Sequence, residues 1–291
     1  MIGCSSVQRI GIALLYKKTT LPKNQIIQNI SYHGAGSEPK HRLDLFLPKG
    51  TNWPVLVFVH GGGWTSGDKD LRVGSADIYG NIGRFYASRG LGVAIINYRL
   101  QPRVNWREQV QDVAKAVAWV HANIAKHGGN SQKIFLAGHS AGAQLISHLA
   151  LNSKWLTEAG VDEKVISGVI SISGAALDLT DEETYRLGEN RDYYASRFND
   201  SHKWKQDASP VSYIQTSSPP FLILFGGSEK TSLKRQSYLL HTALSAAHIK
   251  NQILAVPGQS HSRIVLTLSR DDKTSGPSIL NFIKEHSQKR R

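Results

Sequence analysis

The chain is 291 residues long and strongly basic, with 35 Lys and Arg against 22 Asp and Glu. This length suits one large domain with insertions, or two small ones. Hydrophobic residues make up 40% of the sequence. No apolar run reaches the roughly 18 residues that a membrane-spanning helix needs. The composition therefore predicts a soluble globular protein and argues against a membrane-spanning one.

The basic excess lies partly at the ends of the chain, which closes with Lys289-Arg290-Arg291. A basic surface can favour anionic membranes or nucleic acid. However, the sequence lacks the aromatic-interleaved basic motifs of nucleic-acid-binding modules. We therefore expect no nucleic-acid partner.

The sequence has one cysteine, Cys4, so no internal disulfide is possible. Residues 1–6, MIGCSS, resemble the end of a bacterial lipoprotein signal, although the charged and apolar regions that should precede it are missing. Two interpretations stay open. One is a truncated envelope lipoprotein tethered through Cys4, and the other is a cytoplasmic protein with a free cysteine. We predict an N-terminal tether or extension over 1–28 and one domain over 29–288, with no prediction of oligomeric state.

Apolar runs alternate with helical patterns along the chain. A strand with one buried face is predicted at 42–48, and continuous apolar strands follow at 55–59, 92–98, 133–137, 168–172, 221–225 and 252–256. Helices are predicted through 78–86, over 110–124 and over 143–150. Strands that alternate with helices predict an α/β fold, with a mostly parallel central sheet flanked by helices on both faces.

Residues 176–218 interrupt this alternation. They contain no strand signal but many acidic and aromatic residues. Connections this long are uncommon in a compact domain unless they form lids or binding loops. We predict a cap-like insertion here, packed through Tyr193, Tyr194, Phe198 and Trp204; an ordinary surface excursion is the alternative.

The most informative motif is Gly138-His139-Ser140-Ala141-Gly142, between the predicted strand 133–137 and helix 143–150. Strand, G-x-S-x-G and helix together are typical of a nucleophile elbow, a strained turn that exposes a serine hydroxyl above the end of a sheet. Small residues flank the serine because side chains there would collide with the neighbouring strand and helix. Ser140 is the predicted nucleophile.

A serine needs a base to take its proton, and the base needs a third group to orient it. On this fold the acid follows the serine in the chain and precedes the histidine. Glu229 comes just after the predicted strand 221–225 and is the predicted acid, with Asp207 as the next carboxylate to test.

His261 is the predicted base. It follows a Pro-Gly turn at the end of the predicted strand 252–256, as the chain order requires. His139, inside the motif, is interpreted as a structural neighbour rather than a second base.

Residues 60–64, HGGGW, directly follow the strand 55–59. A glycine run lets backbone N–H groups point at one spot, where they can stabilise a negative oxygen. Gly62 and Gly63, with the N–H of Ala141, are the predicted oxyanion hole. A phosphate-binding loop is excluded because no Lys-Ser/Thr pair follows and no G-x-G-x-x-G opens a helix. Trp64 is predicted to line a partly apolar substrate pocket.

Together these motifs resemble a known family. HGGGW at 60–64, GDK at 67–69, NYRL at 97–100 and GHSAG at 138–142 are similar to the α/β-hydrolase fold esterases. The nearest branch holds hormone-sensitive-lipase-like carboxylesterases, feruloyl and acetyl-xylan esterase-like proteins, and arylformamidases. The resemblance runs from about residue 30 to about residue 283. Two positions depart from the pattern. His139 stands where the lipase-like branch usually has Asp, which moves the resemblance toward the feruloyl-esterase and formamidase branch, and Glu229 stands where the family usually has Asp.

The resemblance implies ester hydrolysis through an acyl-serine intermediate, without a metal or an organic cofactor. We expect a serine carboxylesterase that acts on small-molecule esters with short acyl or aryl groups. The alternatives are an arylformamidase-type amide hydrolase and a non-catalytic binding module on a hydrolase fold. A peptidase is less favoured, since the sequence adds no further domain to restrict access.

Overall fold

The computed structural model describes residues 15–34 and 38–288. Their largest sheet has eight strands in the spatial order β1-β2-β6-β3-β7-β8-β9-β10. In chain order the strands are β1 (Ile26–Ser31), β2 (Arg42–Phe46), β3 (Trp53–Val59), β6 (Gly92–Ile96), β7 (Gly129–His139), β8 (Ile166–Ile172), β9 (Phe221–Gly226) and β10 (Asn251–Val256). β2 is antiparallel to β1 and β6, and all the other pairs are parallel. The predicted mostly parallel sheet is confirmed.

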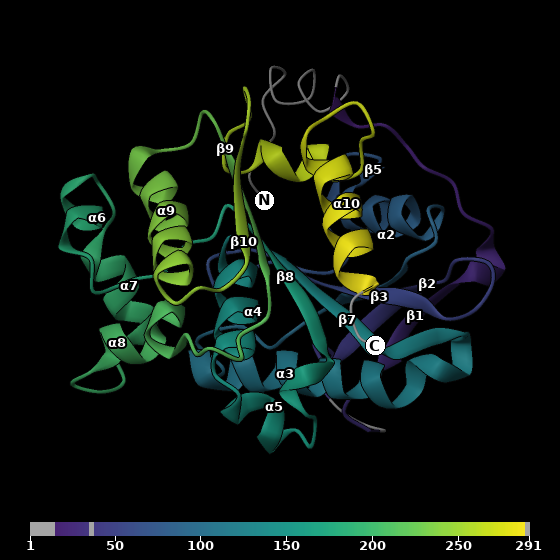
Figure 1. Ribbon diagram of the computed structural model, residues 1–291, viewed down its shortest axis with the longest axis horizontal. Coiled ribbons are helices and arrows are strands. Elements are labelled where there is room, and N and C mark those ends of the chain that lie inside the picture. The colour runs from purple at the N-terminus through teal and green to yellow at the C-terminus, as the bar shows by residue number, and fades with distance from the viewer. Residues whose placement is uncertain (1–14, 35–37, 289–291) are drawn as a thin grey trace.

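Helices cover both faces of this sheet (Figure 1). The longer ones are α2 (Ile78–Ala87), α3 (Trp106–Asn123), α4 (Ala141–Leu151), α9 (Thr231–Ala246) and α10 (Ser275–Ser287). The shorter elements are α5 (Lys154–Glu158), the hairpin β4 (Arg72–Val73) and β5 (Ala76–Asp77), and the 3₁₀ turns η1 (Lys23–Gln25), η2 (Ile124–His127), η3 (Glu163–Val165) and η5 (Arg263–Thr267).

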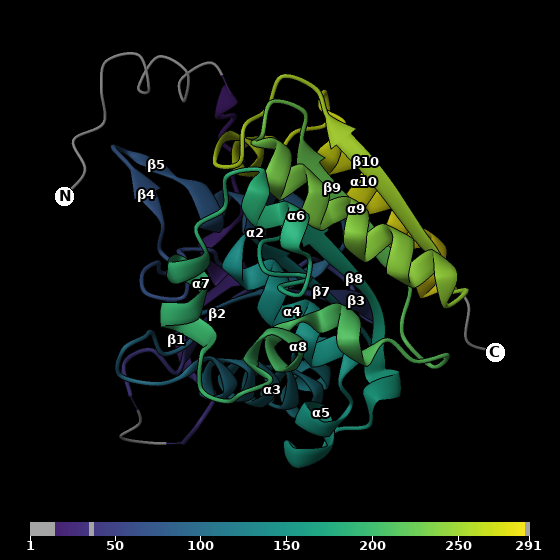
Figure 2. The same cartoon turned by 90° about the vertical axis from the view of Figure 1, so that its left-hand side faces the viewer.

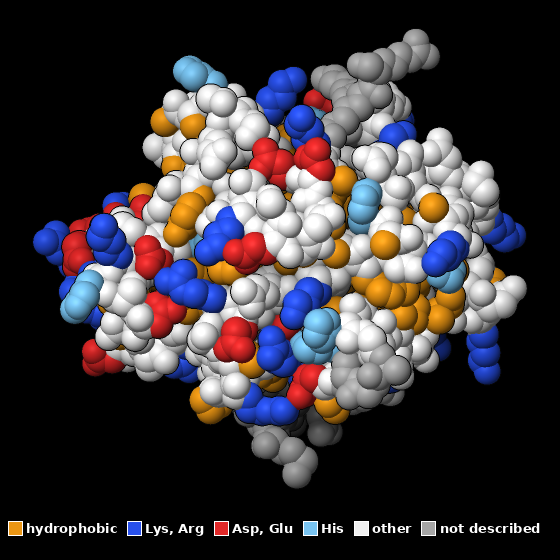
Figure 3. All heavy atoms as spheres, turned by 90° about the horizontal axis from the view of Figure 1, so that it is seen from below, with side chains coloured by type: hydrophobic (Ala, Val, Ile, Leu, Met, Phe, Trp, Pro, Cys, Tyr) orange, Lys and Arg blue, Asp and Glu red, His pale blue; other side chains and the backbone are white. Residues whose placement is uncertain are grey.

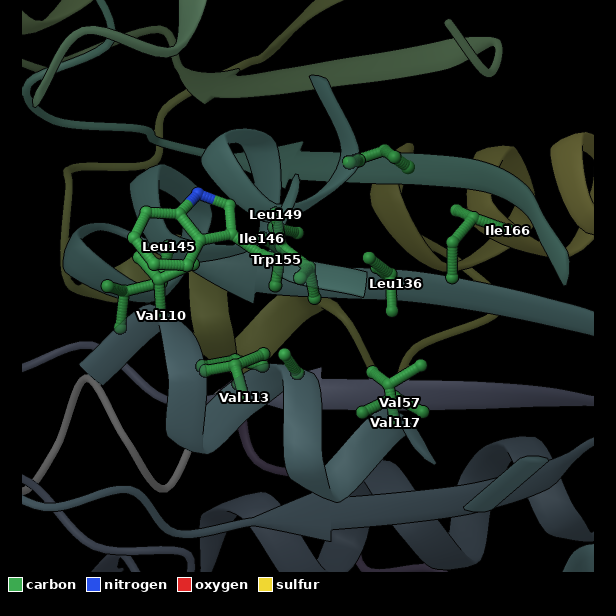
Figure 4. Close-up of a cluster of buried hydrophobic side chains, with 14 of the residues drawn as sticks. Val57, Val110, Val113, Val117, Leu136, Leu145, Ile146, Leu149, Trp155 and Ile166 are labelled. Atoms are coloured by element: carbon green, nitrogen blue, oxygen red, sulfur yellow. The ribbon is translucent and has the colours of Figure 1, made fainter. Parts of the chain in front are cut away.

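The core follows from the alternation of side chains along buried strands. In β3, Val55, Val57 and Val59 belong to the cluster under α3 and α4, whereas Leu56 and Phe58 face the cluster under α2 and α10. Because successive side chains point to opposite faces, a strand covered on both sides must be apolar throughout. Figure 4 shows part of the first cluster, where Val110, Val113 and Val117 of α3 approach the sheet.

The first turn of α3 shows why the helix begins where it does. Asn105 accepts hydrogen bonds from the Arg107 and Glu108 amides, and the Glu108 side chain accepts one from the Asn105 amide. This capping box satisfies amides that have no partner within the helix. The predicted apolar stripe along this helix is fully buried.

The N-terminal segment differs from the predicted tether. From residue 15 on, the chain packs against α2: the Thr19 amide donates to Asn81, and Arg84 donates to the Thr19 carbonyl. Residues 26–31 then form β1 at the edge of the sheet. Residues 15–28, which the prediction gave to a tether or extension, therefore contact the domain, and Cys4 lies outside the described residues.

The segment between β8 and β9 forms no strand in the structure. It contains α6 (Glu182–Arg186), α7 (Arg191–Phe198), α8 (Trp204–Ala208) and the 3₁₀ turn η4 (Pro210–Tyr213). These helices project to one side of the sheet, at the left of Figure 1 and toward the viewer in Figure 2. We call residues 176–218 the cap.

Candidate active site

Ser140 lies at the turn between β7 and α4, in a conformation that few residues adopt. Its φ is 55° and its ψ is −117°. The turn is closed by direct backbone contact: a Cβ on Gly142 would lie 2.3 Å from the Val59 carbonyl oxygen, and one on Gly138 would lie 2.5 Å from the Gly142 carbonyl. No side chain fits at either glycine. The chain thus stores strain at one residue that the surrounding structure fixes.

The structure brings the side chains of Ser140, His261 and Glu229 together. His261 Nε2 lies 2.9 Å from the Ser140 hydroxyl oxygen, within hydrogen-bond reach. On the other side of the ring, His261 Nδ1 lies 3.7 Å from Glu229 Oε2. These two atoms are buried and make no hydrogen bond in the described part of the chain, so closing this gap would satisfy both. Catalytic hydrogen bonds are often long without substrate and tighten when it binds.

Main-chain contacts hold the loops that carry these groups. The Ser228 amide after β9 donates to the Gln259 carbonyl after β10 at 2.9 Å. A Cβ on Gly226 would lie 2.3 Å from the same carbonyl oxygen. The two parallel strands therefore end at the same edge of the sheet, and their loops meet above it.

The surroundings of Glu229 favour its ionised form. Burial by itself opposes its charge, but the neighbouring His261 ring, the Ser173 hydroxyl and the Gly226 amide favour the carboxylate and hold the pKa of Glu229 below its usual value. Ser173 and the Gly226 amide both donate to Oε1, the latter at 2.8 Å. Oε2 is left for the histidine. No sequence pattern pointed to Ser173, which follows the buried strand β8.

His139 contacts the main chain of the base loop. Its Nε2 lies 2.7 Å from the His261 carbonyl oxygen, and burial lowers the pKa of His139 to about 3. The neutral ring can therefore donate Nε2–H to that carbonyl. This placement matches the interpretation of His139 as a structural neighbour, and it adds a contact that positions the loop of His261.

The glycine loop at 60–64, which we call the oxyanion loop, lies directly against the elbow. A Cβ on Gly61 would be 3.2 Å from the Ser140 Cβ. Burial lowers the pKa of His60 to about 4, and the neutral ring donates through Nδ1 to the Gly61 carbonyl at 2.7 Å while it stacks on Tyr98. The loop is therefore shaped by a buried, uncharged histidine.

The predicted oxyanion donors border this contact. Within residues 15–34 and 38–288, the amides of Gly62, Gly63 and Ala141 donate to no acceptor of the protein. Amides without partners, next to a nucleophilic serine, suit the binding of a negatively charged oxygen. Their role remains a prediction.

The structure corrects the placement of Trp64. This residue is expected to line the substrate pocket, but it is 1% exposed and packs edge-on against Phe198 of the cap. Its indole N–H donates to Gln144 at 3.1 Å. A run of small residues ending in Trp gives no indication of which way the ring turns. The ring faces the cap's core, so Trp64 supports the cap.

Asp207, the alternative acid, is engaged elsewhere. Its carboxylate pairs with Arg107 of α3 at 3.0 Å, and its carbonyl accepts from His148. It belongs to the attachment of the cap. The described residues contain no group of three or more His, Cys, Asp and Glu side chains arranged to hold a metal, and no helix among them is long and apolar enough to cross a membrane.

Three features define an α/β-hydrolase fold. The sheet is mostly parallel and covered on both faces, a strained serine lies between β7 and α4, and the loop that carries the histidine follows the last strand. The chain belongs to the BD-FAE family, whose model matches residues 43–244.

Curated relatives are esterases by name. Esterase LipQ of Mycobacterium tuberculosis is 31% identical over 268 residues, covering 88% of this chain and 61% of LipQ. Isoprenylcysteine alpha-carbonyl methylesterase ICME of Arabidopsis thaliana is 30% identical over 260 residues, covering 83% of this chain and 58% of ICME. The chain thus spans about three-fifths of the length of these relatives.

Among solved structures, Esterase B from Lactobacillus rhamnosis superposes with a TM-score of 0.75 at 20% identity, covering 97% of this chain and 92% of its own. A putative thioesterase from a Silicibacter species gives a TM-score of 0.67 at 27% identity, covering 90% of this chain and 86% of its own. These similarities confirm the predicted fold.

Proposed function

We propose that this protein is a serine carboxylesterase that hydrolyses small-molecule esters with short acyl or aryl groups through an acyl-serine intermediate. The observation that carries the proposal is the 2.9 Å contact between His261 Nε2 and the hydroxyl of the strained Ser140. The names of LipQ and ICME support ester hydrolysis.

In the proposed mechanism, His261 takes the proton of Ser140 as its oxygen attacks the ester carbonyl. The amides of Gly62, Gly63 and Ala141 donate to the oxyanion of the tetrahedral intermediate. Glu229 stabilises the imidazolium that forms.

The intermediate then collapses. His261 gives its proton to the leaving alcohol, and an acyl group remains on Ser140. A water molecule, deprotonated by His261, attacks this acyl group, and a second tetrahedral intermediate releases the acid and restores the serine. Every proton taken from serine or water returns to a product or to serine, so no cofactor is needed.

The preference for short acyl groups is supported by the packing around the oxyanion loop. Tyr193 of α7 occupies the space next to Gly63, and Trp64 packs beneath α7. Space on the cap side of the oxyanion loop is therefore limited.

The test is hydrolysis of p-nitrophenyl acetate, butyrate and octanoate, with and without a serine-directed organophosphate. We expect rapid turnover that falls with chain length and disappears when the inhibitor is present. Peptide mass spectrometry should find the organophosphate on Ser140. If the folded protein turns over none of the three esters but hydrolyses an aryl formamide, the activity is that of a formamidase. If it cleaves neither class, the enzymatic proposal is wrong.

A further inference from the structure

Tyr193 of the cap places a hydroxyl group against the oxyanion loop. A Cβ on Gly63 would lie 2.4 Å from the Tyr193 hydroxyl oxygen and 3.7 Å from the ring carbon that bears it. The hydroxyl therefore fills the space that a side chain at position 63 would occupy. Gly63 has a φ of 59°, so this close approach and the backbone conformation both require glycine.

The Tyr193 hydroxyl differs from those of the other tyrosines in the cap. Tyr185 donates to the Leu179 carbonyl at 2.9 Å, Tyr194 to Glu189 at 3.1 Å and Tyr213 to the Asp207 carbonyl at 3.2 Å. Among the described residues, the Tyr193 hydroxyl has no such partner. Phenol groups near the protein interior normally find one. Tyr193 is only partly buried, so its hydroxyl is open to a ligand, and its place beside the unpartnered amides of the oxyanion loop suits an acceptor that both can share.

The ring that carries this hydroxyl is held on several sides. The Tyr193 amide donates to Asn190 at 3.0 Å, which caps the first turn of α7. The guanidinium of Arg197 lies 3.8 Å from the ring centroid and also donates to the Tyr193 carbonyl. The Trp64 ring packs at 6.4 Å on a tilted plane. A donor fixed in this way is preorganised, which is the property that makes an electrostatic contribution to catalysis large.

The cation over the ring adds a second effect. Arg197 lies against the aromatic face, where the ring quadrupole attracts positive charge. The positive charge also attracts a negatively charged ligand atom that accepts a hydrogen bond from the phenol. The ligand best suited to this place is therefore an oxygen that gains negative charge.

We propose that Tyr193 is a further catalytic residue, whose hydroxyl donates a hydrogen bond to the oxyanion of the tetrahedral intermediate alongside the amides of Gly62, Gly63 and Ala141. This inference rests on the proposed esterase function. It also gives the cap a chemical role, because the cap then supplies part of the site that stabilises the transition state.

The test replaces Tyr193 with Phe, which keeps the ring and its packing and removes only the hydroxyl. With p-nitrophenyl acetate we expect kcat to fall by roughly 10- to 100-fold, somewhat less than the loss of a backbone-type donor, while KM stays nearly unchanged. Binding of an aryl trifluoromethyl ketone, which forms an oxyanion with the serine, should weaken by a similar factor. A group that acts only in packing or in substrate binding would not change these two quantities together.

The matched control is Tyr238→Phe on α9. Tyr238 is 51% exposed, and its ring packs on Phe225 at a tilted angle. We expect this variant to keep wild-type kcat. Equal kcat in the wild type and Tyr193→Phe, or a change confined to KM, would overturn the inference but leave the esterase proposal intact. A wild-type protein that hydrolyses no ester would overturn both.

Discussion

The elbow at residues 138–142 and the cap at 176–218 both border the proposed site, but different kinds of contact hold them. The elbow is fixed by main-chain atoms that approach where glycines leave room. The cap is held by side chains of two kinds: Gln144 and His148 of α4 donate to the Ala208 and Asp207 carbonyls at 2.9 and 2.7 Å, and buried apolar residues such as Phe198 pack into the core. An atom added at either glycine of the elbow would therefore collide with the main chain. The cap, in contrast, is attached through side chains, and single substitutions can remove their hydrogen bonds one at a time.

Ion pairs near the surface link the cap helices to one another and to α9. Glu182 pairs with Arg191 and with Lys205, and Asp181 pairs with Arg235 of α9. Figure 3 shows basic and acidic side chains interspersed on the face seen from below. Exposed pairs of this kind contribute little each and are weakened by salt. The cap should therefore be the less stable of the two regions.

The largest expected effect is the loss of kcat when the Ser140 hydroxyl is removed from the elbow. Ser140→Ala should lower kcat for p-nitrophenyl acetate by on the order of 10⁵- to 10⁶-fold, because it removes the group that attacks the ester. The thermal unfolding midpoint should stay close to that of the wild type, since the alanine occupies the same turn. Activity within tenfold of the wild type would refute the assignment of the nucleophile.

Glu229→Gln should have the next largest effect. An amide stabilises the imidazolium poorly and favours the wrong histidine tautomer, so we expect kcat to fall by roughly 10²- to 10⁴-fold. Loss of less than twofold would refute the assignment of Glu229 as the acid.

The same variant has a pH signature. The pKa of Glu229 is lowered in the folded protein, so the carboxylate adds stability above its unfolded pKa of about 4.3 and loses it as the pH falls through the folded value. The difference in free energy of unfolding between wild type and Glu229→Gln should be largest above about pH 5 and shrink in acid. Denaturant titrations across this range measure it.

Gly142→Ala tests the packing of the elbow itself. The added methyl group would lie 2.3 Å from the Val59 carbonyl oxygen, so we expect a loss of about 3 kcal/mol in unfolding free energy. The control is Gly188→Ala in the cap, where a Cβ would meet no atom within 4 Å but φ is 101°. Backbone strain alone should cost about 1–2 kcal/mol there. Equal losses would contradict the role of close main-chain contact.

The smallest expected effect is that of Asp181→Asn at the cap. Hydrogen bonds from Arg235 lower the pKa of Asp181 to about 2. The carboxylate therefore adds stability above its unfolded pKa of about 3.9 and loses it as the pH falls toward 2. We expect the variant to lose about 0.5–1 kcal/mol at pH 7 and only a small fraction of this at pH 2, as followed by urea unfolding. A loss independent of pH would point to the helix cap that Asp181 gives α6 instead.

The central sheet could be predicted because the residue types of its strands indicate burial on both faces. Runs such as 55–59 and 168–172 are apolar throughout, as strands buried on both faces must be. The edge strand β1 was missed. It contains Asn29 at a φ of 57° and an irregular register against β2, which break the alternation. The cap helices have five to eight residues, too short for a periodic pattern to stand out.

For the site, chain order and strand ends were enough to locate Ser140, Glu229 and His261. The contacts of Ser173 and Tyr193 were not predictable, because each joins residues far apart in the sequence with no local pattern. Trp64 was placed wrongly for the same reason: its ring could turn toward substrate or toward the cap, and only tertiary packing decides.

The two hydrogen bonds that anchor the cap to α4 have a consequence for how this protein can change. Gln144 and His148 both bind main-chain carbonyls, which every amino acid offers. These two hydrogen bonds therefore do not require particular side chains at 207 and 208, whereas the ion pair between Asp207 and Arg107 requires a carboxylate at 207. A new cap segment, whether designed or evolved, could therefore keep these two hydrogen bonds, but it would also have to supply a carboxylate for Arg107 and an apolar side chain for Trp64.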